Sequence, residues 1–237
     1  MIRFENVDLK YTDKIILKNV NLNITTNSIV GLIGKSGTGK STILKSFFDF
    51  ELISSGNYLY NGAKIPKNKL KKYKNNIIYI APDDNLITSL DFYKNLQHFY
   101  KKYKNPLFKW LRIFTKQQKE EIFQLCNHFG MSEFIFKPIE QLSAGQKQRF
   151  AIILNLLNDT KILLCDELTS NLDITNAKLV FDYLQSIKKN KYIIIALHNL
   201  SDAVKYIDKI IAIKDQEIQK IYYKGEYDPD ELRKYFD

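Results

Sequence analysis

Cysteine and histidine are scarce in this 237-residue chain, which has two cysteines, Cys126 and Cys165, and three histidines. So few of either residue exclude a disulfide framework and a zinc-like cluster. The apolar runs are also short, and the run at 193–197 falls far below the roughly 20 residues that cross a bilayer. The chain does not start with the basic and then apolar regions of a secretory signal, so we expect a soluble cytosolic protein.

Arginine is rare too, although the net charge is +10: lysine supplies 32 of the 36 basic residues and arginine only four. Recognition of phosphates and bases in nucleic acids favours the arginine fork, so we expect no nucleic-acid partner. The densest basic stretch, 64–74, would suit anionic lipid headgroups better. The 20 asparagines beside the lysines indicate a general lysine and asparagine bias instead of a surface shaped for phosphates.

The spacing of apolar residues changes along the chain. Apolar and polar residues alternate over 2–9 and 15–24, which predicts antiparallel strands with one solvated face. Helical spacing begins near residue 90 and continues to 140, with many aromatic residues among lysines. Other predicted elements are strands at 28–33, 57–60, 76–81, 161–165, 192–197 and 210–213, and helices at 146–158 and 229–236. Strands that alternate with helices predict a largely parallel α/β core.

A glycine-rich loop follows the predicted strand 28–33 and matches the pattern G-x-x-x-x-G-K-[ST]. Backbone N–H groups of such a loop close around phosphate oxygens, and glycines allow this approach or supply a positive φ. Lys40 would reach the β- and γ-phosphates, and the Ser41 hydroxyl would bind Mg²⁺. The predicted nucleotide-binding residues are Gly34, Lys35, Ser36, Gly37, Thr38, Gly39, Lys40, Ser41 and Thr42.

Two acids follow the buried strand predicted at 161–165. Asp166 lies at the carboxyl end of the strand, where it could hold Mg²⁺ opposite Ser41. Glu167 follows it and could orient or deprotonate an attacking water. His198 comes directly after strand 192–197, and a parallel sheet would bring it to the same edge, near the γ-phosphate.

The segment Leu142-Ser143-Ala144-Gly145-Gln146 decides among P-loop proteins. Here the chain resembles the ATP-binding cassette (ABC) ATPases, whose signature LSGGQ it matches with one Gly-to-Ala change. The resemblance spans almost the whole chain: Asp173 falls in the D-loop, His198 at the switch histidine, and Tyr11 at the aromatic residue that stacks on adenine.

The resemblance implies a P-loop NTPase (RecA-like) core with an N-terminal antiparallel β-subdomain and an inserted α-helical subdomain. We expect the core and β-subdomain in 1–87 and 141–237, and the helical subdomain in 88–140. Family members work as dimers, so one chain supplies the loop and the acids, and Ser143, Ala144, Gly145 and Gln146 of the other chain contact the γ-phosphate. ATP would then join two chains, and its hydrolysis would release them.

One position departs from the family pattern. Where the family has a glutamine that touches Mg²⁺, this chain has Pro82, followed by Asp83. We hypothesise that Asp83 takes over the metal contact; the alternative is that water does.

The sequence therefore predicts an ATP-hydrolysing subunit of an ABC transporter, docked to a separately encoded membrane protein on the inner face of the cell membrane. A short cassette with no regulatory extension favours export. Three alternatives stay open: a soluble assembly ATPase of the same family, a cassette that binds ATP without hydrolysis, and a P-loop GTPase or kinase. Against the last alternative, the chain has no N-K-x-D guanine motif, and neither a GTPase nor a kinase would explain the signature segment.

Overall fold

A computed structural model of the chain describes residues 1–81 and 86–236. It divides into two compact units, which are described separately: one comprises 1–81, 160–168 and 183–237, the other 82–159 and 169–182. Residues 88–140, the predicted helical subdomain, all fall in the second unit, and this unit also takes in 141–159 and 169–182.

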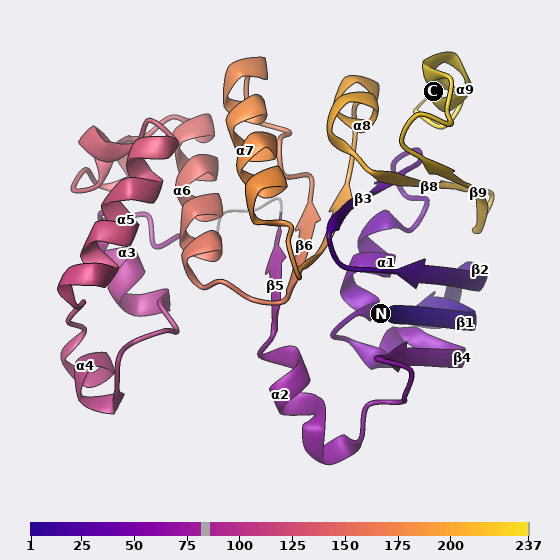
Figure 1. Ribbon diagram of the computed structural model, residues 1–237, viewed down its shortest axis with the longest axis horizontal. Helices are drawn as coiled ribbons and strands as arrows, with labels where there is room; N and C mark the ends of the chain where they lie inside the picture. Colours follow the sequence, from indigo (N-terminus) through magenta and orange to yellow (C-terminus); the bar gives the residue numbers. More distant parts are fainter. Residues whose placement is uncertain (82–85, 237) are drawn as a thin grey trace. The chain divides into compact units, whose positions relative to one another are not determined.

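The first unit begins with an antiparallel sheet in the order β2-β1-β4 (Figure 1). Its strands are β1 (Ile2–Tyr11), β2 (Lys14–Ile24) and β4 (Ile53–Tyr60). Alternate residues of β1 are buried, Ile2 and Phe4 and then, after a register shift, Val7 and Leu9, which explains the period-2 pattern in the sequence. The predicted antiparallel β-subdomain is confirmed, with β4 beginning four residues before the predicted start.

A second sheet of the same unit has the order β5-β6-β7-β3-β8-β9. Its parallel strands are β5 (Ile77–Ile80), β6 (Ile162–Asp166), β7 (Tyr192–Ala196), β3 (Ser28–Ile33) and β8 (Lys209–Lys214). The last strand, β9 (Glu217–Tyr223), forms an antiparallel hairpin with β8. The parallel strands are apolar almost throughout because both faces are covered, as expected for a doubly wound α/β core.

Helices of the first unit connect these strands. The helix α1 (Lys40–Ser46) packs against β1, β6 and β7, and α8 (Leu200–Tyr206) packs against β3. Two further short helices are α2 (Leu70–Lys74) and α9 (Pro229–Arg233). One apolar core, with Phe4, Phe47 and Ile194 in it, joins the two sheets.

The second unit is helical. Its helices are α3 (Phe92–Phe99), α4 (Pro106–Leu111), α5 (Lys116–His128) and α6 (Ala144–Leu157). Both α3 and α5 pack against α6, and the rings of Phe92 and Phe150 stack with centroids 4.0 Å apart. The helix α7 (Ile174–Ile187) begins in this unit, and its residues 183–187 belong to the first. None of the described helices is long and apolar enough to span a bilayer.

Candidate active site

The glycine-rich loop lies between β3 and α1 in the first unit. Its carbonyl groups hold the Lys40 ammonium, which donates hydrogen bonds to the oxygens of Gly34 at 2.6 Å and Lys35 at 3.1 Å. The Thr38 hydroxyl also donates to the Lys35 carbonyl, at 2.9 Å. These bonds hold the loop in a curved conformation, and α1 begins directly after it. The dipole of this helix adds positive potential at the end of the loop.

Gly39 is the residue before α1, and its backbone requires glycine. It has φ +102°, and a Cβ at this position would lie 2.9 Å from side-chain carbons of both Ile16 and Leu17 on β2. Only glycine satisfies both conditions without strain. Strand β2 of the antiparallel sheet therefore packs against the end of the loop and sets its position.

The carboxyl ends of β6 and β7 bring Asp166, Glu167 and His198 to one edge of the parallel sheet. In the register of β6 with β7, Asp166 lies beside Ala196, so Glu167 and His198 follow the two strands at neighbouring places. His198 Nε2 and Glu167 Oε1 are 2.8 Å apart, and each side chain is about a third exposed. A water molecule can therefore reach the Glu167 carboxylate. Glu167 has φ +55°, a conformation that costs free energy in a residue with a side chain and is concentrated at functional sites.

Asp166 is held from the other side. It is only 4 % exposed, and the Tyr79 hydroxyl, on the neighbouring strand β5, donates a hydrogen bond to its Oδ2 at 2.8 Å. Burial and this hydrogen bond raise the pKa of Tyr79 well above its ordinary value, so the hydroxyl keeps its proton and acts as the donor. Burial lowers the pKa of Lys40, and the charges of Glu167 and Asp166 oppose that shift. Cation and carboxylates thus share one electrostatic site.

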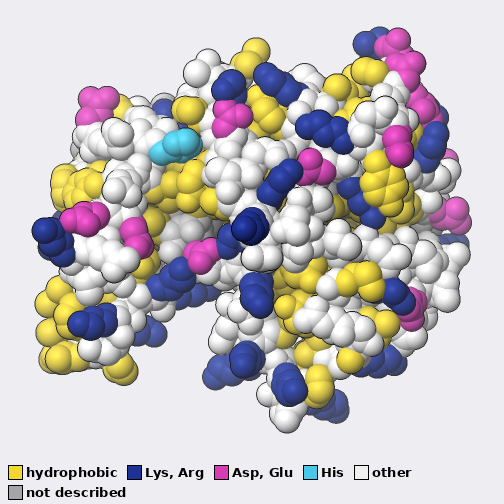
Figure 2. All heavy atoms as spheres, in the orientation of Figure 1, with side chains coloured by type: hydrophobic (Ala, Val, Ile, Leu, Met, Phe, Trp, Pro, Cys, Tyr) yellow, Lys and Arg dark blue, Asp and Glu magenta, His cyan; other side chains and the backbone are white. Residues whose placement is uncertain are grey.

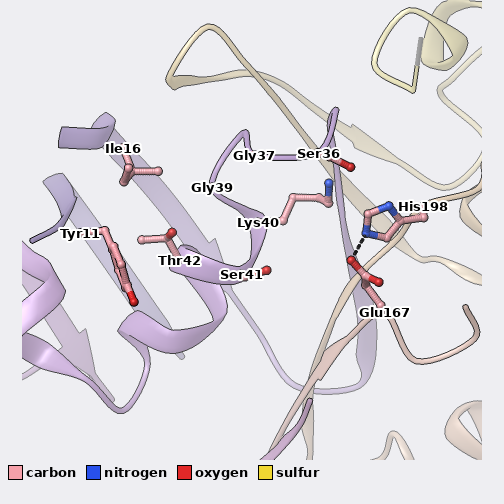
Figure 3. A pocket seen from close by; sticks show the side chains of 10 residues that line it. All are labelled: Tyr11, Ile16, Ser36, Gly37, Gly39, Lys40, Ser41, Thr42, Glu167 and His198. Atoms are coloured by element: carbon pink, nitrogen blue, oxygen red, sulfur yellow. Dashed lines mark ion pairs between the residues drawn. The ribbon is translucent and has the colours of Figure 1, made fainter. Parts of the chain in front are cut away.

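Lys40, Glu167 and His198 line a hollow of about 320 Å³, a size in the range of small-molecule sites (Figure 3). Tyr11 and Ile16 lie at one end, Glu167 and His198 at the other, and the loop and the start of α1 lie between them. The lining residues are Tyr11, Ile16, Ser36, Gly37, Gly39, Lys40, Ser41, Thr42, Glu167 and His198. An extended ligand with an aromatic group at one end and anionic groups at the other fits this arrangement.

Oxygen donors suit magnesium at the anionic end. Ser41 and Asp166 would supply a hydroxyl and a carboxylate, and Mg²⁺ commonly takes its other ligands from phosphate and water. Among the residues that the structure describes, no cluster of three or more His, Cys, Asp or Glu side chains could hold a metal ion by itself. Pro82 and Asp83, where the sequence departs from the family, lie outside the described residues.

The signature segment belongs to the second unit. Ser143 caps α6 in a reciprocal capping box: its Oγ accepts from the Gln146 amide at 3.3 Å, and Gln146 Oε1 accepts from the Ser143 amide at 2.9 Å. Gly145 lies against the chain before α7, because a Cβ there would be 3.1 Å from the Asn171 carbonyl oxygen. Ala144, between them, is the first residue of α6.

Asp173 lies two residues beyond Asn171 and caps α7. It accepts hydrogen bonds from the Asn176 amide at 2.8 Å and the Asn176 side chain at 2.7 Å, which lower the pKa of Asp173. The signature and D-loop segments are therefore neighbours within this unit.

Two residues of the site were missed at the sequence level. Ile16 lines the hollow beside Gly39, and the Tyr79 hydroxyl donates a hydrogen bond to Asp166. Neither position belongs to a motif. The Tyr79 contact depends on β5 lying next to β6, and the sequence does not specify this strand order.

The fold and the loop, acids and histidine at one sheet edge define a P-loop ATPase. Comparison with known proteins narrows the class. A family model described as "ABC transporter" matches residues 17–170, and the chain belongs to this family as an ATP-binding cassette ATPase.

Relatives and solved structures agree with this assignment. The chain is 34% identical to the phosphonates import ATP-binding protein PhnC of Fusobacterium nucleatum, over 100% of this chain and 98% of that protein. It is 30% identical to the probable ABC transporter ATP-binding protein p29 of Mycoplasma pneumoniae, over 91% of this chain and 89% of the relative. A dimeric bacterial ABC transporter cassette superposes with TM-score 0.77 at 26% identity, over 96% of this chain and all of that one.

Proposed function

We propose that this chain hydrolyses Mg²⁺-ATP at composite sites of a cassette dimer and thereby drives an importer whose membrane subunit is a separate protein. The observation that supports this best is the hollow in which Lys40, Glu167 and His198 meet. Lys40 and the loop amides bind the phosphates, and Tyr11 stacks on the base. Glu167 takes a proton from the attacking water, and His198 holds the Glu167 carboxylate in place and senses the γ-phosphate.

Magnesium has a defined place in this proposal. It neutralises charge on the β- and γ-phosphates when it is bound. Ser41 and Asp166 would hold it, and Tyr79 would fix the orientation of the Asp166 carboxylate through its hydrogen bond. Asp83 remains a candidate for a further contact.

The second half of each site comes from the other chain of the dimer. The 14-residue helix α6 starts at the signature segment, and its first amides have no partner within the helix by geometry. Together with the Ser143 hydroxyl they can bind a γ-phosphate held by another chain. Asp173 would lie at the contact between the chains. The solved dimeric cassettes, one of them a post-hydrolysis state with ADP and Pi, support this arrangement.

Import replaces the export that the sequence alone favoured. That expectation rested on the short length of the cassette, which does not determine the direction of transport. The relatives in Fusobacterium nucleatum and Oceanobacillus iheyensis, 34% and 35% identical, are both named phosphonates import proteins. We therefore propose a phosphonate as the cargo and the inner face of the membrane as the location. Loss of alkylphosphonate uptake on deletion of the gene, restored by the wild-type chain, would support this, and unchanged uptake would contradict it.

Replacement of Glu167 by Gln tests the proposed chemistry. The amide keeps the size of the side chain but cannot accept the proton, so we expect turnover to fall about 10²-fold or more while ATP binding persists. Phosphate release measures turnover, and gel filtration with ATP should show a trapped dimer. Glu217→Gln, on the exposed hairpin strand β9, is the matched control and should hydrolyse ATP normally. Near-normal turnover of the Glu167 variant would refute the assignment of the base.

A further inference from the structure

The helix α4 and Ile113, two residues after its end, expose large apolar side chains to solvent. Leu107 is 58 % exposed, Trp110 78 %, Leu111 47 % and Ile113 47 %. The first three have the spacing i, i+3, i+4 and so share one face of the helix. A contiguous apolar group of this kind marks an interaction site more often than a chance cluster.

This exposure does not come from a loosely attached segment. Phe114 is buried and packs against Tyr103 in a stacked pair with centroids 5.3 Å apart, so the segment already has an inward face. The Asn105 side chain caps α4, accepting from the Phe108 amide at 3.0 Å. Arg112 caps the carboxyl end of the helix, and its carbonyl oxygen accepts from the Gln97 side chain of α3 at 2.9 Å.

The sequence around the exposed group has a net positive charge. Residues 92–119 contain eight Lys and Arg residues and no Asp or Glu. Lys94, Lys102 and Lys116 pair with acids that lie outside this stretch. Lys104 lies beside α4, with Nζ 5.8 Å from the centre of the Phe108 ring. Figure 2 shows hydrophobic and dark blue side chains together at the lower left, where Figure 1 places α4.

This combination selects among possible partners. Lysine is depleted at protein–protein interfaces, whereas tryptophan with surrounding lysine is typical of groups that lie at the boundary of an anionic bilayer. Basic residues near such a surface each add attraction, and the apolar side chains enter the boundary region. Because the segment is held in place, binding would not have to order it first.

We propose that the exposed face of α4 (Leu107, Trp110, Leu111), with Ile113 and the neighbouring lysines, binds the surface of a membrane that contains anionic lipid. This surface lies in the helical unit and does not include the ATP site. The binding would hold the cassette against the bilayer independently of any membrane subunit.

Trp110 is the only tryptophan of the chain, so its fluorescence reports this surface directly. The full chain is titrated with vesicles of phosphatidylcholine alone and with vesicles in which half of the lipid is phosphatidylglycerol. We expect a shift of the emission to shorter wavelength only with phosphatidylglycerol, and quenching when the acyl chains carry bromine. High salt should weaken the binding, because the attraction is screened.

Variants separate the charge from the apolar contact. Removal of two charges in Lys104→Gln/Lys109→Gln should weaken vesicle binding about 20- to 30-fold, at about fivefold for each charge. Leu107→Ser/Leu111→Ser should remove the quenching by brominated lipid. The matched control is Lys69→Gln/Lys71→Gln, which removes the same charge from the basic stretch 64–74. This stretch has no large exposed apolar side chain to enter the bilayer, so the variant should bind as the wild type does.

Several results would overturn the proposal. These are an equal response to both kinds of vesicle, no response to either, and unchanged binding of the α4 charge variant. A shift that follows protein concentration without lipid would assign this face to self-association, and one that needs vesicles carrying a membrane subunit would assign it to that protein. The outcome is separable from the proposed ATPase chemistry, because Glu167→Gln should bind vesicles normally while it fails to turn over.

Discussion

The position of the phosphate-binding loop depends on Gly39, and Gly39→Ala tests this. Two contributions determine how much this substitution lowers the free energy of unfolding. The left-handed backbone, at φ +102°, disfavours alanine by about 1–2 kcal/mol. The new Cβ would lie 2.9 Å from Ile16 Cγ2 and 2.9 Å from Leu17 Cδ1, and relief of such crowding costs about 1–3 kcal/mol.

Gly37→Ala isolates the second term. Gly37 also has a positive φ, +81°, but a Cβ there meets nothing within 4 Å. Both variants gain about 0.4–1 kcal/mol from the less flexible unfolded chain, so this term cancels in the comparison. We therefore expect Gly39→Ala to be less stable than Gly37→Ala by about 1–3 kcal/mol.

Equilibrium unfolding in urea without nucleotide measures this difference. A double-mutant cycle adds a second measurement, because Leu17→Ala removes the Leu17 carbon atoms that the new Cβ would crowd and leaves Ile16 Cγ2 in place. Alone it should cost about 2–5 kcal/mol, since Leu17 is fully buried, and beside Gly39→Ala it should cost less. Equal stability of the two glycine variants, together with no coupling to Leu17, would refute the view that β2 positions the loop.

Two further predictions concern the site and the signature. Tyr79→Phe removes the hydroxyl that donates to the buried Asp166 carboxylate. We expect urea unfolding to show that the free energy of unfolding falls by about 1.5–3 kcal/mol, and ATP hydrolysis to need a higher Mg²⁺ concentration. An unfolding midpoint equal to that of the wild type would contradict this. Ser143→Ala and Thr115→Ala each remove a capping box, from α6 and α5, and each should cost about 1 kcal/mol of stability. Only Ser143→Ala should also lower ATPase activity, and an equal effect of both variants on turnover would show that Ser143 acts only as a cap.

Much of the fold could be predicted because its signals are local. Alternating apolar residues specify β1 and β2, and the predicted α/β core is confirmed. The motif order led to the family, which the comparisons show. The neighbourhood of Glu167 and His198 also followed from one rule, that parallel strands present their carboxyl ends at the same edge.

The remainder depends on long-range arrangement. The hydrogen bond from Tyr79 to Asp166 requires β5 beside β6, and 87 residues separate the two side chains in sequence. The positive φ of Glu167 follows from how the chain leaves β6 and has no residue signature, because glycine is the usual marker of such a conformation. The exposure of Trp110 was equally hidden, since helical spacing cannot distinguish an apolar face that is buried from one that remains in solvent.

In the helical unit, a side-chain hydrogen bond and a close backbone approach join α6, which begins at the signature, to the D-loop. The Gln148 side chain accepts a hydrogen bond from the Asn171 amide at 3.1 Å, and the Asn171 carbonyl oxygen lies where a Cβ on Gly145 would crowd it, at 3.1 Å. Both contacts hold the chain before α7 to the first turns of α6. A shift of Asp173 would therefore move the signature amides as well, because Asp173 lies only two residues from Asn171, which contacts α6. In the proposed dimer the two segments would thus respond together to the γ-phosphate, which would link the loss of this phosphate on hydrolysis to the separation of the chains.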